Sequence, residues 1–105
     1  MCKNRYRRSC QRGETMKKRK HYIFKGRVQG VGFRITAYQR AIKLKLTGWI
    51  RNLSNGDVEA VFQGEEAFID DLVRYMNTIR YISIDSMDIQ ELDLLDNEKT
   101  FEMKY

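Results

Sequence analysis

Residues 21–44 read HYIFKGRVQGVGFRITAYQRAIKL, and within this stretch the spacing of apolar residues changes on either side of a cluster of glycines. Before the glycines, apolar residues alternate as in a strand with one buried face; these are Tyr22, Phe24 and Val28. After them, apolar residues recur every three or four positions, as on one face of a helix; these are Phe33, Ala37, Ala41 and Leu44. We therefore predict a strand over residues 21–28, a glycine-bearing turn over 29–32 and a helix over 33–44.

The rest of the chain continues with segments of the same two kinds. A second strand is expected over residues 46–53, and Asn55-Gly56 after it favours a type I′ hairpin turn, in which both positions need positive φ. The segments expected next are a strand carrying Val58, Ala60 and Phe62, a helix over 64–79, a strand over 81–95, a turn over 96–98 and a short strand over 101–105. The order β-α-β-β-α-β with an extra terminal strand predicts an α+β sandwich, in which two helices cover one face of an antiparallel sheet and the other face is open to water.

The formal net charge of +6 is distributed unevenly along the 105 residues. Residues 1–20 contain nine basic side chains and one acidic side chain, whereas residues 21–105 contain 11 basic and 13 acidic side chains, a net charge of −2. The body of the chain therefore lacks the basic surface that is typical of nucleic-acid-binding domains. We expect residues 1–19 to be a disordered basic tail and residues 20–105 to form one domain. A basic arm that docks on nucleic acid or acidic lipid is the alternative role of the tail.

Targeting and metal signals are missing from the sequence. No apolar run approaches the roughly 18 residues that a membrane span needs, and the first residues lack the apolar stretch of a secretory signal. Cys2 and Cys10 lie in the tail at a spacing that matches no common zinc site, and His21 is the one histidine of the chain. We expect a cytoplasmic protein with no membrane or metal partner, whose two cysteines are free thiols. A Cys2–Cys10 disulfide is the alternative.

The candidate anion site is the strand-to-helix segment GRVQGVGFR, residues 26–34. Small residues in such a turn let successive main-chain N–H groups converge on an anion, and the start of the next helix adds N–H donors and about half a positive charge. Arg34 supplies a charged fork that fits two phosphate oxygens. The glycine spacing matches neither a nucleoside-triphosphate P-loop nor a dinucleotide-binding loop. The alternative is a tight turn without a ligand, in which Arg34 is a surface residue.

Asn52 is the second candidate site residue. In the expected topology the end of the strand over 46–53 lies at the same edge of the sheet as the turn over 29–32, and Asn52 is at that end. An uncharged carboxamide beside an anion site is suited to orienting a water molecule. The alternative is that Asn52 only begins the turn that follows.

Two segments, GRVQGVGFR over residues 26–34 and GWIRN over residues 48–52 followed by NGDVE over 55–59, resemble the two signatures of the acylphosphatase family. The resemblance spans about residues 20–105 and implies the ferredoxin-like form of the α+β sandwich. It implies hydrolysis of a small-molecule acyl phosphate to a carboxylate and inorganic phosphate, with no metal or other cofactor. Arg34 would then bind the phosphoryl group and Asn52 would position the attacking water. The main-chain amides that complete the phosphate site would be those of Gln29, Gly30, Val31, Gly32, Phe33 and Arg34.

The sequence departs from the family pattern at two places. Lys45 stands where the family usually has glycine; if its backbone is left-handed, lysine costs about 1 kcal/mol relative to glycine. The chain also contains no proline, which relatives often carry before the fourth strand, so the resemblance does not predict the conformation of the loop over 78–83.

Three further expectations concern ligands and partners. We expect inorganic phosphate or sulfate to bind as an anion and the chain to be a monomer. A second function class is a non-catalytic anion-binding module related to the N-terminal domain of carbamoyl-phosphate-handling maturation enzymes. A third is RNA binding on the sheet, for which Tyr22, Phe24 and Phe62 are the available aromatic residues. Their expected place in the core argues against RNA binding.

Overall fold

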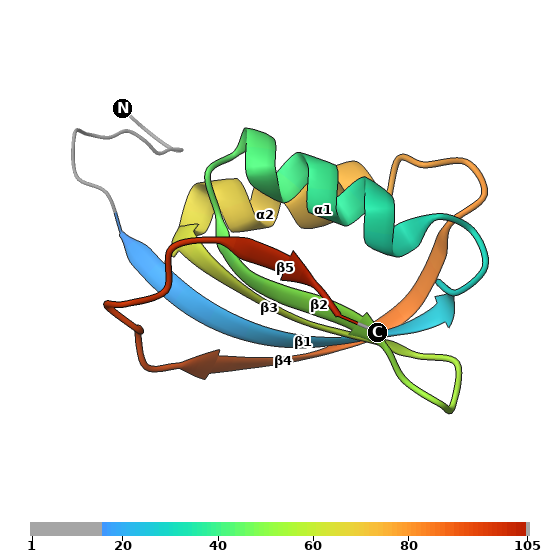
Figure 1. Cartoon of the computed structure of the whole chain (residues 1–105). Helices are drawn as coiled ribbons and strands as arrows, with labels where there is room; N and C mark the ends of the chain where they lie inside the picture. Colours follow the sequence, from blue (N-terminus) through green and yellow to red (C-terminus); the bar gives the residue numbers. More distant parts are fainter. Residues whose placement is uncertain (1–15, 105) are drawn as a thin grey trace.

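The computed structural model describes residues 16–104, which form five strands and two helices (Figure 1). Residues 1–15 of the expected tail, which include Cys2 and Cys10, lie outside the described residues. Within residues 16–104, neither helix is long and apolar enough to cross a membrane. The elements are β1 (Lys17–Arg27), α1 (Phe33–Lys43), β2 (Thr47–Asn52), β3 (Val58–Glu65), α2 (Glu66–Met76), β4 (Ser83–Leu92) and β5 (Phe101–Met103).

The strands form one sheet in the order β4-β1-β3-β2-β5, and both helices cover one face of it (Figure 1). This arrangement confirms the predicted α+β sandwich. The sheet is mixed, however, because β5 pairs with β2 in parallel while the other neighbours are antiparallel. The prediction of an antiparallel sheet is therefore wrong for β5. The chain leaves β4 at the end of the sheet where β2 begins, so that β5 starts there and runs in the direction of β2.

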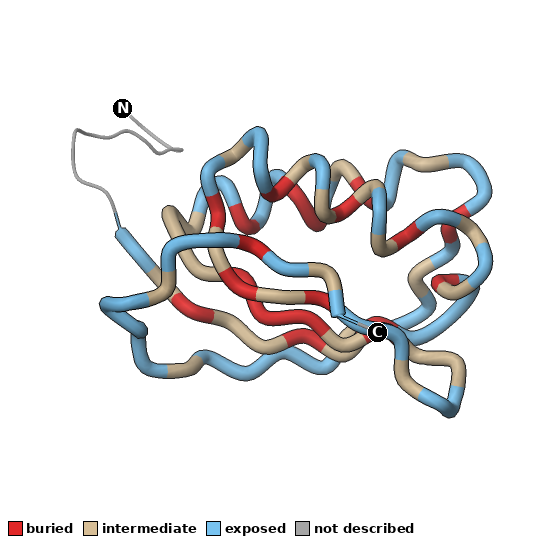
Figure 2. The backbone as a smooth tube through the Cα atoms, viewed as in Figure 1, coloured by how far each residue is buried: buried red, intermediate tan, exposed pale blue. Residues whose placement is uncertain are grey.

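The core lies between the helices and the sheet, where Figure 2 shows most of the buried residues. Aromatic rings fill its centre: Tyr22 stacks on Phe24 with ring centroids 5.2 Å apart, and Phe62 stacks on Phe101 at 5.4 Å. The three aromatic residues considered for RNA stacking, Tyr22, Phe24 and Phe62, are at most 2% exposed. They are part of the core, as expected, and are not available to bind bases.

β1 begins at Lys17, three residues earlier than the expected start of the domain. Residues 17–19 pair with the end of β3, and Arg19 is 6% exposed. A run of basic residues suggested a solvated tail, but these residues pair as a strand, and Lys18 and Arg19 form ion pairs with Glu91 and Glu98. Residues 17–19, which were expected to belong to the tail, are therefore part of β1.

α2 and β4 are shorter than predicted. Gly64 and Glu65 belong to β3 and not to α2, because they pair with the start of β1. After α2, residues 77–79 form turns in place of a further helical turn; Thr78 N–H donates to the Tyr75 carbonyl at 2.9 Å. β4 begins at Ser83 and ends at Leu92, so the residues on either side of it that were assigned to a strand are loop.

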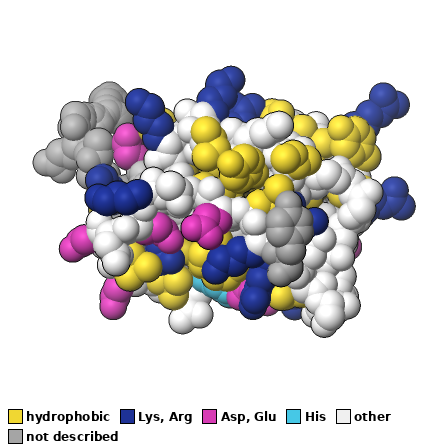
Figure 3. Space-filling view, viewed as in Figure 1, with side chains coloured by type: hydrophobic (Ala, Val, Ile, Leu, Met, Phe, Trp, Pro, Cys, Tyr) yellow, Lys and Arg dark blue, Asp and Glu magenta, His cyan; other side chains and the backbone are white. Residues whose placement is uncertain are grey.

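The helix-free face of the sheet is less open to water than expected. The β4–β5 connection folds back against it: the Gln63 side chain donates to the Leu95 carbonyl and accepts from the Leu95 N–H, both at 2.9 Å. Arg19 Nη1 lies 2.6 Å from Glu98 Oε1, and Val61 on the same face is 2% exposed. Figure 3 shows acidic side chains on the side of the molecule where this connection runs. The prediction of a fully solvated face is thus only partly correct.

α1 ends in a left-handed residue at Lys45, which has a φ of 60°. Leu46 N–H donates to the Ala41 carbonyl at 2.9 Å, and Lys45 N–H donates to the Ile42 carbonyl at 3.1 Å. This pair of bonds is the Schellman motif, whose left-handed position is usually glycine. The left-handed conformation considered for Lys45 is therefore confirmed.

Candidate active site

The β1–α1 loop forms a cradle at the start of α1. Gly30 and Gly32 have φ of 74° and 77°, values that residues with a Cβ rarely adopt. Val28 and Phe33, on either side of the loop, are each 1% exposed, so both ends of the cradle are anchored in the core. The first turn of α1 contains no acidic residue, which leaves its positive end available to an anion.

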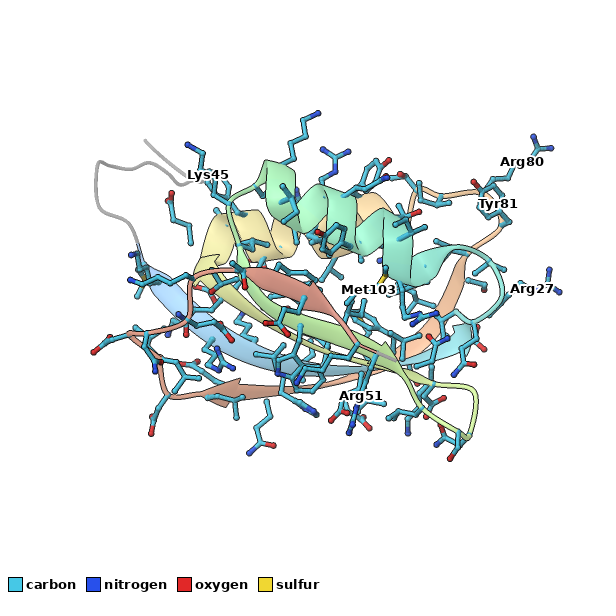
Figure 4. The ribbon with its side chains drawn as sticks, viewed as in Figure 1. Arg27, Lys45, Arg51, Arg80, Tyr81 and Met103 are labelled. Carbon is cyan, nitrogen blue, oxygen red and sulfur yellow. The ribbon has the colours of Figure 1, made fainter. Side chains whose placement is uncertain are left out.

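Arg34 and Asn52 line one pocket of about 230 Å³. The other lining groups used below come from the cradle and from β5: Gln29, Gly30, Gly32 and Met103. Figure 4 shows Met103 where β5 passes the start of α1. The structure therefore brings together the two predicted site residues and most of the predicted cradle, whereas Val31 does not line the pocket. A larger pocket, of about 390 Å³, lies at the opposite end of the sheet and contains none of these residues.

The side chain of Arg34 contacts the main chain that follows β5. Its Nη1 donates to the Lys104 carbonyl oxygen at 3.0 Å, and Lys104 N–H donates to the Ile50 carbonyl of β2 at 2.8 Å. The guanidinium is thus held at the pocket by a segment 70 residues further along the chain. Because its partner is a main-chain carbonyl, no sequence signal at residue 104 could have identified this contact.

The side chain of Gln29 connects the cradle to the β2–β3 hairpin. Its Nε2 donates to the Leu53 carbonyl at 2.6 Å and to the Asp57 carbonyl at 2.8 Å. Sequence reasoning assigned only the main chain of Gln29 to the site. The side-chain contact was missed, because both acceptors are again main-chain atoms.

The hairpin turn differs from the predicted type I′. Gly56 has a φ of 98°, but Asn55 has a negative φ, since Lys45 is the one non-glycine residue with positive φ among residues 16–104. Gly56 N–H donates to the Leu53 carbonyl at 3.3 Å, and the Asn55 side chain accepts from Asp57 N–H at 3.0 Å. The Asn55 side chain thus stabilises an Asx turn, and the left-handed position falls on Gly56 alone.

The arginines next to the predicted site residues point away from the pocket. Figure 4 shows Arg27 directed outward from the end of β1 and Arg51 on the face of the sheet opposite the helices. Arg51 Nε donates to Glu59 at 2.7 Å, and the second Glu59 oxygen lies 2.7 Å from His21 Nε2. Burial raises the pKa of Glu59, but the hydrogen bonds from His21 and Arg51 outweigh it and lower the pKa overall. Arg51 is therefore a cross-strand partner of Glu59.

No group of three His, Cys, Asp or Glu side chains within residues 16–104 is arranged to hold a metal ion. The charged groups that the structure places at the pocket are Arg34 and the start of α1. An arrangement of a guanidinium, main-chain N–H groups and one carboxamide can bind a phosphate-like anion and orient a water molecule beside it.

Comparison with known proteins identifies the family. The acylphosphatase family model matches residues 20–103. An acylphosphatase from Picrophilus torridus is 43% identical over 87 residues, which cover 80% of this chain and 99% of that protein. The crystal structure of acylphosphatase from Bacillus subtilis superposes with a TM-score of 0.76 at 31% identity and covers 86% of this chain and 100% of that one.

A structure of HypF from T. kodakarensis also resembles the chain, with a TM-score of 0.73 and 28% identity, but the match covers only 12% of that larger protein. The similarity extends over nearly the full length of the acylphosphatases, and this favours the enzyme over the anion-binding module. The chain therefore belongs to the acylphosphatase family and is an enzyme that hydrolyses acyl phosphates.

Proposed function

We propose that the pocket between the cradle and the end of β2 is the active site. In this proposal Arg34 and the main-chain amides of residues 29–34 hold the phosphoryl group, and Asn52 orients the attacking water. The observation that carries the proposal is that Arg34, Gly30, Gly32 and Asn52 line one small pocket although they come from different elements.

The chemistry needs few functional groups. In an acyl phosphate the leaving group is a carboxylate, so the protein mainly has to hold the phosphoryl oxygens and align a water molecule opposite the leaving oxygen. The water oxygen forms a bond to phosphorus as the bond from phosphorus to the acyl oxygen breaks. The products are a carboxylate and inorganic phosphate. Asn52 cannot accept a proton at neutral pH, so the proton of the water passes to a substrate oxygen.

Charge stabilisation is assigned to Arg34. Its guanidinium donates in two parallel directions and matches two phosphoryl oxygens, while the start of α1 adds N–H donors. The bond from Nη1 to the Lys104 carbonyl limits the freedom of this side chain before substrate binds. A group fixed in advance stabilises the developing charge without having to reorganise during the reaction.

Kinetics of benzoyl phosphate hydrolysis test the two roles. Asn52→Ala is expected to lower kcat by about 100-fold or more and to leave the inhibition constant of inorganic phosphate within about threefold of wild type. Arg34→Ala is expected to weaken both turnover and phosphate binding. The matched controls are Asn97→Ala and Arg74→Ala, exposed residues away from the pocket. Wild-type turnover in Asn52→Ala would contradict the assignment of Asn52.

Three further measurements test the metal-free mechanism, the inhibition by anions and the oligomeric state of the enzyme. We expect hydrolysis to persist in EDTA, because Arg34 and main-chain donors carry the positive charge that a metal would otherwise provide. We expect phosphate and sulfate to inhibit competitively. We also expect a monomer in size-exclusion chromatography. Loss of activity in EDTA that Mg²⁺ restores would contradict the mechanism.

A further inference from the structure

We propose that the side chain of Gln29 is a positioning residue that fixes Asn52 relative to the phosphate cradle. This inference rests on the proposed role of Asn52 in orienting the attacking water. It goes beyond the main-chain role of Gln29, because it concerns the carboxamide and the hairpin that the carboxamide holds.

The geometry gives the carboxamide one orientation. Both partners of the Gln29 side chain are carbonyl oxygens, at 2.6 Å for Leu53 and 2.8 Å for Asp57. Only the NH₂ group can donate to both, and a flipped amide would place its oxygen against two other oxygens. The two N–H bonds of one nitrogen therefore close the neck of the hairpin from the side of the cradle.

Because the tip of the β2–β3 hairpin is exposed, the hairpin depends on its contact with the Gln29 side chain. Asn52 ends β2 and precedes Leu53, and Ser54 and Asn55 are exposed at the tip. Across the neck, Leu53 N–H donates to the Asp57 carbonyl at 2.8 Å, so the same carbonyl serves the hairpin and Gln29. Loss of the Gln29 side chain would leave two half-buried carbonyls without this donor and would free the hairpin to move.

The cradle depends on Gln29 much less. Val28 and Phe33 hold its two ends in the core, and neither contact involves the carboxamide. Removing the side chain should therefore displace Asn52 more than it displaces the phosphate-binding amides. A displacement of this kind lowers the rate of the chemical step more than it weakens anion binding.

The first test is Gln29→Leu, which keeps much of the side-chain volume but has no donor. We expect kcat for benzoyl phosphate to fall by about tenfold, with the phosphate inhibition constant within about twofold of wild type. Gln63→Leu is the matched control, since Gln63 also binds the main chain of one loop residue twice, but away from the pocket. We expect its kcat to stay at the wild-type value. An unchanged kcat in Gln29→Leu, or an equal loss in Gln63→Leu, would overturn the proposal.

The second test is a double-mutant cycle with Asn52→Ala. If Gln29 acts through Asn52, Gln29→Leu should lower kcat by less than about twofold once Asn52 is alanine. A full tenfold loss in that background would show that Gln29 acts elsewhere and would overturn the proposal. Failure of the underlying role of Asn52 is distinguishable, because Asn52→Ala alone would then retain wild-type turnover whatever Gln29 does.

Gln29→Glu serves as a second variant in case Gln29→Leu does not fold. It has nearly the same shape, but at pH 7 a carboxylate oxygen would face the Leu53 and Asp57 carbonyls. We expect its kcat to be lower than that of Gln29→Leu at pH 7 and to recover relative to wild type as the pH falls toward 5, where a protonated carboxyl can again donate. Wild-type kcat at pH 7 would overturn the proposal.

Discussion

Lys45 adopts a backbone conformation that glycine reaches at lower cost. Its φ is 60°, and its exposed side chain points away from the body of the protein (Figure 4). Lys45→Gly is therefore expected to stabilise the fold by about 1 kcal/mol and to raise Tm by roughly 4–8 °C. Lys45→Ala, which keeps a Cβ, should show no such gain. Thermal unfolding of the three proteins measures the effect, and equal gains in both variants would contradict the backbone explanation.

At the scale of single residues, the sequence predicted two side chains that line one pocket and missed the side-chain contacts to main-chain atoms. Arg34 and Asn52 were predicted from their side-chain chemistry and their places in the expected topology, and the structure brings them to one pocket. The contact of Arg34 with the Lys104 carbonyl and the contacts of Gln29 with the hairpin were not predictable. Any residue provides a carbonyl, so only the three-dimensional structure shows which one is used.

Among the elements, β2 packs against β3 at Gly48 without room for a Cβ. This residue has a φ of 130°, and a Cβ built on it would overlap the carbonyl oxygen of Val61. Gly48→Ala is expected to lower the free energy of unfolding by about 3 kcal/mol, because the main chain of β3 cannot move away without breaking the ladder. Gly56→Ala, at a position with φ of 98° but open space around it, should cost only about 1 kcal/mol. Urea unfolding of both variants tests the difference, and equal costs would show that contact with β3 is not decisive.

Cross-strand pairing of Glu59 makes the sheet sensitive to acid. Its pKa lies below the usual value of 4.5 in the folded protein, so the unfolded chain binds a proton at higher pH than the folded chain does. The stability from Glu59 is therefore present above about pH 4.5 and is lost as the pH falls through the lower folded pKa. The difference in unfolding free energy between wild type and Glu59→Gln should shrink between pH 6 and pH 3, as measured by urea unfolding. A constant difference over that range would contradict the pKa shift.

Element types were easier to predict than element ends. The spacing of apolar residues along the sequence identified each strand and helix. The junction of β3 and α2, however, lies at Glu65, inside a segment whose pattern also suits a helix. Pairing of Gly64 and Glu65 with β1 decides that junction, and pairing is a long-range interaction. The Asn55-Gly56 turn was predicted at the right place with the wrong geometry, since the dipeptide serves more than one turn type.

At the scale of the whole molecule, one ion pair joins the first strand to the last connection. Arg19 and Glu98 have side chains 8% and 16% exposed, and Thr47 also donates to the same Glu98 oxygen at 2.9 Å. Glu98→Ala would leave the Arg19 charge buried without its anion, and we expect a loss of about 3 kcal/mol in unfolding free energy. Glu91→Ala removes the acidic partner of Lys18, in an ion pair that is more exposed than the pair of Arg19 and Glu98. It should cost less than about 1 kcal/mol. Chemical unfolding compares the two, and similar losses would show that burial of the pair is unimportant.

The overall architecture was predictable because the order of strands and helices leaves few ways to cover one face of a sheet. Two features depended on the complete fold. The parallel pairing of β5 follows from the end of the sheet at which the chain leaves β4, and the partial cover of the helix-free face follows from the path of the connection. Neither path has a local signal in the sequence. The basic residues 17–19 were misassigned for the same reason, since their partners lie in β3 and in residue 98.

The bond between Arg34 and the carbonyl of residue 104 has a consequence for biosynthesis. When a nascent polypeptide has emerged from the ribosome only as far as β4, Gln29, Arg34 and Asn52 are outside, whereas residue 104, whose carbonyl accepts from Arg34, is still inside the exit tunnel. Because we propose that Arg34 holds the phosphoryl group, we expect full turnover only after residue 104 has emerged and β5 has joined the edge of the sheet. Hydrolysis of an acyl phosphate by this chain thus reports that synthesis and folding have both reached the final strand.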